Sequence, residues 1–291
     1  MSIMDKDNRP YDEEGLQRHI EMALAVERPA TPGMELSYQF IKRVFRPLLV
    51  NPEQLPDEPC LFVSNHSLFA ADGYILAPVM YCEQDRFLRG LGDRFLWNDK
   101  SEDLLLKMGG VIGDPQVCSA LMENGNDLLV YPGGAHEATK TAAQRYTLQW
   151  KQRYGFVRLA AQHGYTIMPM AMIGPDEFYN HWMEGEDIPD SMIGKMLTRA
   201  GVLNENTRPD MLPPLPRGAF GSLLPRPQRC YVKFGEPVRL ASLKGKKTTK
   251  KKLLDIREDV AHQIEDLLQE LMLLRERNRG DEGLLRRLLT L

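Results

Sequence analysis

A histidine and an aspartate between Phe62 and Gly73 are of the residue types needed for general-base chemistry. His66 and Asp72 are separated by five residues, a gap that a tight turn can close. A carboxylate that accepts a hydrogen bond from one ring nitrogen fixes the histidine tautomer and leaves the other nitrogen free to take a proton from a hydroxyl. We therefore predict that His66 is a general base oriented by Asp72. The alternative is that His66 is a loop histidine and that Asp72 caps the helix that follows.

A second segment offers backbone hydrogen-bond donors. Pro132, Gly133 and Gly134 follow a buried apolar run and form a sharp turn. Exposed N–H groups in such a turn can hold an oxyanion, a carboxylate or a phosphate. Glu137, just beyond the turn, is predicted to bind acceptor hydroxyls or to brace the turn. Acyl transfer from a thioester to an alcohol needs a base, a partner that orients it and donors for the oxyanion that forms.

The remaining candidates are single residues near these segments or on other helices. Asn65 and His136 adjoin the two motifs and are added as substrate-binding candidates. Arg94, Arg153 and Arg158 are candidates for contact with the phosphates of an acyl carrier, with a surface or bracing charge as the alternative for each. No metal-ligand spacing and no Gly-x-Ser-x-Gly elbow occur, so we expect no metal and no bound cofactor.

Composition and charge exclude several classes of protein. The 291 residues fit one large domain or a domain with appendages. A net charge of -3 and a pI near 6.1 argue against a nucleic-acid partner. The widely spaced cysteines form no CxxC pair, which favours a reducing cytosol. The start of the chain lacks a secretory signal, and no segment has the roughly 20 apolar residues needed to span a bilayer, so any membrane contact is expected to be peripheral, at the cytoplasmic face.

From Pro59 onward, short apolar runs alternate with helical segments, a pattern typical of an α/β sheet domain. The first strand, over residues 60–64, places His66 at the C-terminal end of a strand, where open α/β sheets bind their ligands. Further strands are predicted at 111–112, 128–131, 166–173 and 230–234, and helices at 74–79, 115–123 and 148–163. We therefore predict a central mixed, mostly parallel sheet flanked by helices.

The chain is predicted to have three regions. Residues 1–50 form an N-terminal helical pair, over 11–29 and 35–49; residues 51–242 form the α/β domain, with a proline-rich irregular excursion at 204–228; and residues 243–291 form a basic loop and C-terminal amphipathic helices. The apolar stripe of the second helix indicates a core-facing side, with a lipid surface as the alternative.

The lysine run at 244–252 is interpreted as a solvated loop or as a contact with an anionic membrane, worth about 1 kcal/mol per residue near the surface. The leucine- and arginine-rich tail at 284–289 favours the membrane contact. Helices of this type also serve as oligomer contacts, so the oligomeric state stays open.

The two motifs together resemble the glycerolipid acyltransferase superfamily, which includes glycerol-phosphate and lysophosphatidate acyltransferases. The resemblance rests on SNHSLFAADG and LLVYPGGAHEATK and covers about residues 36–237. Superfamily members typically have four residues between the histidine and the aspartate and a Pro-Glu-Gly turn, whereas this chain has five residues and Pro-Gly-Gly. In both its five-residue spacing and its Pro-Gly-Gly turn, the chain is similar to the branch of PGG-type diacylglycerol acyltransferases and phytyl ester synthases. YTLQWKQRYGFVRLA and TIMPMAMIG are similar to that branch's arginine-glycine-phenylalanine helix and the strand after it.

The resemblance implies an O-acyltransferase that moves a fatty acyl group from acyl-CoA or acyl-ACP to the hydroxyl of a lysophospholipid, a glycerolipid or another lipid alcohol. His66 and Asp72 match the superfamily's dyad, and Glu137 matches the branch's glutamate. His136 stands where an arginine is usual, and Gly113-Asp114 lies where phosphate-handling members carry an arginine. Loss of guanidinium groups removes bidentate phosphate recognition, which favours a neutral alcohol or a lysolipid.

Two other functions are compatible with these residues. One is an acyl thioesterase or esterase, in which water replaces the alcohol and the same base and donors serve. The other is a non-catalytic lipid- or membrane-binding protein of the same fold, which the lengthened spacing between His66 and Asp72 and the histidine at position 136 would suit.

Overall fold

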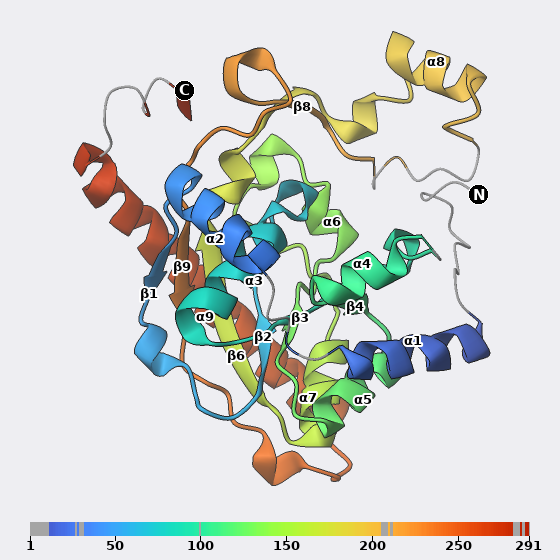
Figure 1. The fold of residues 1–291 in the computed structure, drawn as a ribbon, viewed down its shortest axis with the longest axis vertical. Helices are drawn as coiled ribbons and strands as arrows, with labels where there is room; N and C mark the ends of the chain where they lie inside the picture. The colour runs from blue at the N-terminus through green and yellow to red at the C-terminus, as the bar shows by residue number, and fades with distance from the viewer. Residues whose placement is uncertain are drawn as a thin grey trace.

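A seven-stranded sheet lies at the centre of the structure, a computed structural model that describes residues 12–26, 28, 32–98, 100–204, 209, 212–281, 286, 289 and 290. The strand order is β1-β9-β6-β2-β5-β3-β4, with β1 Leu48–Val50, β2 Cys60–Val63, β3 Arg89–Gly92, β4 Gly110–Ile112, β5 Leu128–Val130, β6 Thr166–Ile173 and β9 Tyr231–Phe234. Neighbouring strands are parallel except β6 and β9, which are antiparallel. The predicted mixed, mostly parallel sheet is confirmed (Figure 1).

Helices cover both faces of this sheet (Figure 1). Because side chains alternate along a strand, Phe62 of β2 packs on one face and Leu61 and Val63 on the other. The face of Phe62 is covered by α2 (Pro32–Val44) and α3 (Ala71–Gln84). The opposite face is covered by α1 (Glu13–Ala25), α5 (Pro115–Glu123), α7 (Gly155–His163) and α9 (Lys250–Asn278). The sheet therefore lies between two apolar cores.

The predicted helices at both ends of the chain are present as α1, α2 and α9. The long helix α9 lies against β6 and β9 and buries its apolar side in the same core as the sheet, through Leu253, Ile256, Val260, Ile264, Leu267, Leu268 and Leu271. In the tail, residues 282–285, 287, 288 and 291 lie outside the described part, as do residues 1–11.

Two predicted helices have different bounds in the structure. The second helix ends at Val44 rather than at residue 49, because Arg46 precedes a proline and has a φ of 44°, and Leu48–Val50 then forms the edge strand β1. The helix predicted at 148–163 begins only at Gly155, since the preceding segment is irregular. Trp150 is buried there against Phe156, so its apolar character reflects packing and not helical periodicity.

A small unit projects from one end of the molecule (Figure 1). It contains β7 (Asn180–Met183), antiparallel to β8 (Leu215–Arg217), and α8 (Met192–Arg199). The strand β8 lies within the segment 204–228, so the prediction of a wholly irregular excursion is wrong there, because backbone pairing with β7 holds the proline-rich chain extended. None of the helices in the described part of the chain is long and apolar enough to cross a membrane.

Candidate active site

His66 and Asp72 contact each other just beyond the C-terminal end of β2. Nδ1 of His66 lies 3.0 and 2.9 Å from Oδ1 and Oδ2 of Asp72, which belongs to the first turn of α3. The carboxylate also accepts the backbone N–H of Ser67 at 2.6 Å and that of Gly73 at 2.7 Å. Charge-assisted hydrogen bonds of this kind hold a carboxylate in one orientation. Asp72 is therefore fixed by the backbone on both sides of the turn.

The longer spacing between the two residues is closed by a turn with two left-handed residues. Phe69 and Ala70 have φ values of 58° and 56° within the short 3-10 helix η2 (Leu68–Ala70) that precedes α3. A left-handed conformation costs a non-glycine residue roughly 1–2 kcal/mol. With these two left-handed residues, the turn brings the Asp72 carboxylate to Nδ1 of His66 despite the additional residue.

The ring of Tyr131 supports the imidazole of His66. The two ring centroids are 4.0 Å apart and their planes differ by 10°. Nε2 of His66 has no hydrogen-bond partner among the described residues, and the His66 side chain is 11% exposed. The Tyr131 hydroxyl is buried without a partner in that same part of the chain, and burial, together with the charge of Asp72, raises the pKa of Tyr131 well above its usual range. The histidine is thus held on one ring edge and one face, with Nε2 left available.

Glu137 joins the second motif to the first. Its Oε2 accepts the backbone N–H of His66 at 3.1 Å, and its Oε1 accepts that of Gln149 at 2.7 Å. The residue is fully buried, and burial raises the pKa of Glu137 to about 7 even though Lys140 and these N–H groups favour the charged form. Both oxygens therefore have partners within the protein, which corresponds to the bracing alternative for Glu137.

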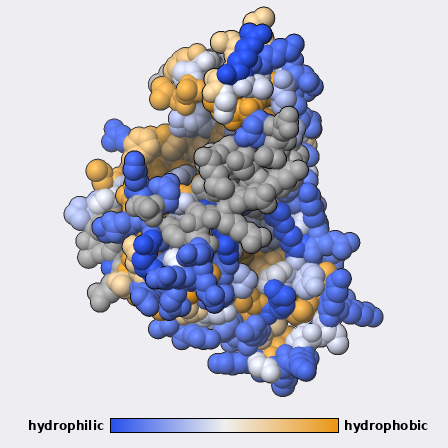
Figure 2. All heavy atoms as spheres, turned by 90° about the vertical axis from the view of Figure 1, so that its right-hand side faces the viewer, coloured by the Kyte–Doolittle hydropathy of each residue, from blue (hydrophilic) through white to orange (hydrophobic). Residues whose placement is uncertain are grey.

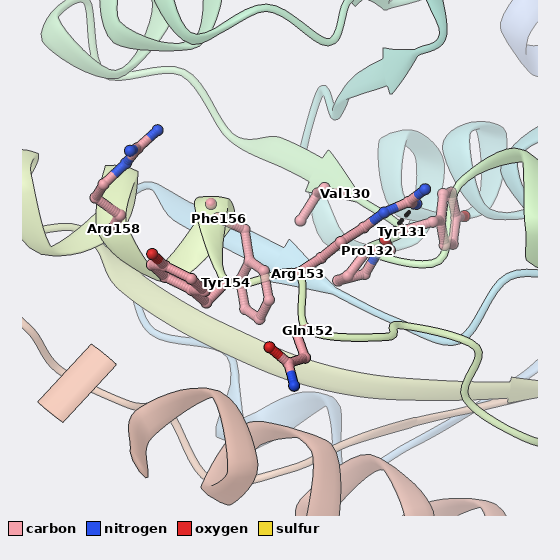
Figure 3. Close-up of a pocket in the computed structure, with 9 residues that line it drawn as sticks. Val130, Tyr131, Pro132, Gln152, Arg153, Tyr154, Phe156 and Arg158 are labelled. Carbon is pink, nitrogen blue, oxygen red and sulfur yellow. Dashed lines mark hydrogen bonds between the residues drawn. The ribbon is translucent and has the colours of Figure 1, made fainter. Parts of the chain in front are cut away.

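The Pro132-Gly133-Gly134 turn has tightly defined surroundings. A Cβ at Gly133 would overlap the side chain of Glu137, so only glycine fits there. Gly134 has a φ of 53° and donates its N–H to the Tyr131 carbonyl at 2.9 Å. Nη1 of Arg153 donates to the carbonyl of Pro132 at 2.9 Å (Figure 3) and to that of Gly133 at 2.7 Å. Arg153, proposed from sequence as a phosphate contact, braces the turn in this structure.

Three other predicted residues lie around these motifs in different roles. The side-chain amide of Asn65 bonds both backbone groups of Met172 on β6, each at 2.9 Å, and so ties the end of β2 to its neighbour. Nε2 of His136 lies 3.0 Å from Nζ of Lys151. Arg94, after β3, forms an ion pair with Asp114. Asn65 lies next to the dyad because it precedes His66 in the chain. The described contacts of Arg94 and His136 are with residues outside the dyad.

A buried ion pair that was not predicted holds the loop after His66. Oδ1 of Asp176 accepts the N–H of Leu68 at 2.9 Å, and Oδ2 lies 3.0 Å from Nζ of Lys140. Both side chains are 1% exposed. Asp176 belongs to η5 (Pro175–Glu177), directly after β6, at the edge of the sheet that also carries the end of β2. A Gly-Pro-Asp turn after a buried strand was the available sequence signal.

A pocket of about 450 Å³ lies between the end of β5 and the start of α7. Figure 3 labels most of its lining, including Tyr131, Arg153, Tyr154 and Arg158. Tyr131 belongs to this lining and its ring stacks on His66, whereas neither His66 nor Asp72 lines the pocket. The lining is largely apolar and includes the guanidinium groups of Arg153 and Arg158.

The chain is similar in sequence to several named acyltransferases. The sequence model of the family "Diacylglycerol acyltransferase" matches residues 103–275, more than half of the chain. Phytyl ester synthase 2 (chloroplastic) of Arabidopsis thaliana is 28% identical over 243 residues, which is 77% of this chain and 34% of that protein. Diacylglycerol O-acyltransferase 2A of Umbelopsis ramanniana is 24% identical over 154 residues, 49% of this chain and 39% of that protein.

A solved structure, the 1-acyl-sn-glycerophosphate acyltransferase PlsC of Thermotoga maritima, aligns with a TM-score of 0.45 at 13% identity and covers 86% of this chain and 88% of that one. The chain spans about a third of the length of the phytyl ester synthases that it matches.

Proposed function

Because this chain belongs to the diacylglycerol acyltransferase family, we propose that it transfers a fatty acyl group from an acyl thioester to the hydroxyl of a lipid, with His66 as the general base. The observation that carries the proposal is the contact between Nδ1 of His66 and the carboxylate of Asp72, which leaves Nε2 available for a hydroxyl. Acyl-CoA or acyl-ACP is the proposed donor. The proposed acceptors are lysophospholipids, glycerolipids and other lipid alcohols.

The proposed reaction proceeds in two proton-coupled steps. Nε2 of His66 takes the acceptor's hydroxyl proton as the oxygen attacks the thioester carbonyl, which gives a tetrahedral intermediate and an imidazolium. The carboxylate of Asp72 stabilises this imidazolium through Nδ1. Collapse of the intermediate expels the thiolate, which takes the proton back from Nε2, so an ester and a free thiol are the products.

The turn after β5 is proposed to stabilise the oxyanion of the intermediate. Since the N–H of Gly134 is bonded to the Tyr131 carbonyl, the N–H of Gly133 is the group to which we assign this role. Glu137 contributes by holding the backbone of His66, and hence the base, against this turn.

A peripheral position at the cytoplasmic face of a membrane is also proposed. Leu36 and Phe40 are 73% and 61% exposed on α2, whereas Ile41 and Phe45 are buried. The exposed pair is followed by Lys42 and Arg43, a combination that suits the interface of an anionic bilayer.

Thiol release from palmitoyl-CoA, with mass spectrometry of the lipid products, tests the proposed function. The full chain is assayed with glycerol 3-phosphate, lysophospholipids, monoacylglycerol, diacylglycerol and fatty alcohols as acceptors. We expect an ester with at least one acceptor, and its loss in His66→Ala but not in His262→Ala, which changes an exposed histidine on α9.

Free fatty acid without ester would assign the protein to the thioesterases. Lipid binding without thiol release from any acyl donor, unchanged in His66→Ala, would assign it to the non-catalytic lipid-binding proteins. Retention of most activity by His66→Ala would overturn the role proposed for that residue.

A further inference from the structure

Three arginines from distant parts of the chain gather around residues 178–180, where the projecting unit meets the rest of the molecule. Nη2 of Arg145 donates to the Tyr179 carbonyl at 2.7 Å and to Oδ1 of Asn180 at 3.3 Å. Arg217 is the strand partner of Asn180 across β7 and β8. The backbone N–H of Arg226 donates to the Phe178 carbonyl at 3.0 Å. The backbone of Arg217 and Arg226 and the side chain of Arg145 therefore bring the three arginines to one short segment.

Their positive charge is not balanced within the described part of the chain. Arg226 is 9% exposed, yet its guanidinium has no hydrogen bond or ion pair with a described residue. Nε of Arg145 is likewise buried without a partner in that part of the chain. Burial lowers the pKa of Arg226, and the charges of Arg145 and Arg217 lower it further. Most of the Arg226 side chain is buried among other cations, while its guanidinium nitrogens are not among the fully buried atoms, so an anionic ligand could contact them and would be stabilised there.

The carboxylates near this segment already have partners. Asp176 is paired with Lys140, and Glu177 with Arg275 at 2.7 Å. Glu184 accepts from Nδ1 of His181 at 2.8 Å. These carboxylates therefore pair with other residues and not with Arg145, Arg217 and Arg226, which we call the arginine cluster. The cluster brings several guanidinium hydrogen-bond donors together.

The arginine cluster adjoins the loop that carries the dyad. The rings of Tyr179 and Phe69 meet edge to face with centroids 5.6 Å apart, and Phe69 belongs to the turn between His66 and Asp72. The N–H of Leu68 is bonded to Asp176, two residues before Phe178. If the cluster binds one end of a ligand, the rest of that ligand would therefore lie close to the residues that follow His66.

Large exposed apolar side chains lie on the same chain segments as the cluster. Arg217 lies over the ring of Trp182, 5.7 Å from its centroid, and the Tyr179 hydroxyl donates to the Leu223 carbonyl at 3.2 Å. Trp182, Phe220, Leu223 and Leu224 are all at least 65% exposed. At the upper end of the face in Figure 2, the end at which α8 lies in Figure 1, apolar and hydrophilic side chains are both exposed. Cationic donors within an apolar rim match the chemistry of a charged headgroup attached to acyl chains.

We propose that Arg145, Arg217 and Arg226 bind a phosphate group, and that the apolar rim selects a phosphate carried by a lipid. Guanidinium groups present paired N–H donors that fit phosphate oxygens. The phosphate site stands on this geometry alone, whereas its use in presenting a substrate to His66 rests on the proposed function. The sequence argued against glycerol 3-phosphate as the acceptor because arginines are missing from the two motifs. The arginine cluster supplies such groups from outside them.

Isothermal titration calorimetry of the full chain with three soluble probes tests the phosphate site. The probes are dioctanoyl phosphatidic acid, dioctanoylglycerol and inorganic phosphate. We expect the phosphatidic acid to bind at least about tenfold more tightly than the dioctanoylglycerol, as expected for charge-assisted hydrogen bonds. Arg226→Gln should remove this difference, and so should Arg217→Gln, which changes an exposed residue and serves if the buried variant does not fold.

Arg277→Gln, at an exposed position on α9, is the matched control and should leave the preference for phosphatidic acid unchanged. Inorganic phosphate binding as tightly as phosphatidic acid would support the anion site and overturn the role of the lipid. Equal affinity for the two lipids, or a preference that survives both Arg226→Gln and Arg217→Gln, would overturn the site itself. His66→Ala should bind all three probes like the unchanged chain, so failure of the proposed catalysis and failure of this site are measured separately.

Discussion

The backbone N–H of His66 donates to Oε2 of Glu137, a residue 71 positions later in the chain. The same carboxylate accepts the N–H of Gln149 through its other oxygen. One buried side chain thus joins the end of β2, the turn after β5 and the segment before α7. The position of the base depends on the second motif as much as on Asp72.

Replacing Asp72 by Asn should reveal how much the carboxylate contributes to the orientation of His66, because the volume of the side chain is nearly unchanged. The amide keeps the volume but places an N–H₂ group or a neutral oxygen where Nδ1 of His66 and the N–H of Ser67 now find a carboxylate. We expect kcat to fall on the order of 10⁴-fold, the loss typical when a histidine-orienting aspartate is replaced by asparagine. Steady-state thiol release measures this. Asp85→Asn, at an exposed position at the end of the same helix, should retain the rate of the unchanged chain.

Gly133→Ala should destabilise the protein because the new methyl group would overlap the side chain of Glu137. The glutamate must then move away from the N–H groups of His66 and Gln149, and leaving buried donors unpaired costs about 1–3 kcal/mol each. Chemical denaturation should show a lower free energy of unfolding. Gly155→Ala is the control, since a Cβ there meets nothing within 4 Å and the residue begins α7. A Gly133→Ala variant as stable as Gly155→Ala would contradict this packing.

Tyr131 should be tolerant of loss of its hydroxyl and intolerant of loss of its ring. Tyr131→Phe removes a buried hydroxyl that has no partner among the described residues, so the free energy of unfolding should stay the same or rise by about 1 kcal/mol. Tyr131→Leu removes the ring on which His66 stacks and should lower kcat. Thermal unfolding and thiol release on both variants provide the measurements. A large loss of kcat in Tyr131→Phe alone would instead assign the hydroxyl to the chemistry.

The parts of the site that could be predicted from sequence are those carried by one contiguous segment. The apolar run before Ser64 ends at the histidine, so its position at the end of a strand followed from the pattern. The Pro132-Gly133-Gly134 turn was similarly predictable, because a close backbone approach demands glycine. The strand β1 was missed because its three residues continue the apolar spacing of the preceding helix, and so short a strand shows no alternation.

The parts that could not be predicted depend on residues that meet only in three dimensions. Lys140 and Asp176 are 36 residues apart, and neither residue by itself differs from a charged residue in an exposed loop. The arginine cluster combines two loops and a strand without any shared periodicity, and only the pairing of β7 with β8 places Arg217 opposite Asn180. Such long-range contacts leave no local pattern.

Removal of the buried partner of Asp176 should be more damaging than removal of an exposed lysine. Lys140→Met leaves a buried carboxylate without its cation, which is expected to cost about 3–5 kcal/mol. The double change Lys140→Met with Asp176→Asn should cost less than the sum of the single changes, because the amide oxygen can still accept the N–H of Leu68. A double-mutant cycle of urea unfolding measures the coupling. Lys107→Met, at an exposed pair, is the control, and a coupling near zero for Lys140 would contradict the buried pair.

The free energy of unfolding should depend on pH through the ionisation of Glu137. Burial raises its pKa from 4.5 to about 7, so between these values the folded state holds the proton more tightly than the unfolded chain does. The free energy of unfolding therefore falls as the pH rises through this window, by up to about 3 kcal/mol from this group. Glu137→Gln cannot ionise and should lose that slope between pH 4.5 and 7. The variant should also be less stable at low pH, since its N–H₂ group would face the N–H of His66 or Gln149.

Urea unfolding of both proteins at several pH values gives the two slopes, with Glu258→Gln on the exposed side of α9 as the control. Identical slopes for the unchanged chain and Glu137→Gln would mean that Glu137 is ionised throughout the window and braces His66 as a carboxylate.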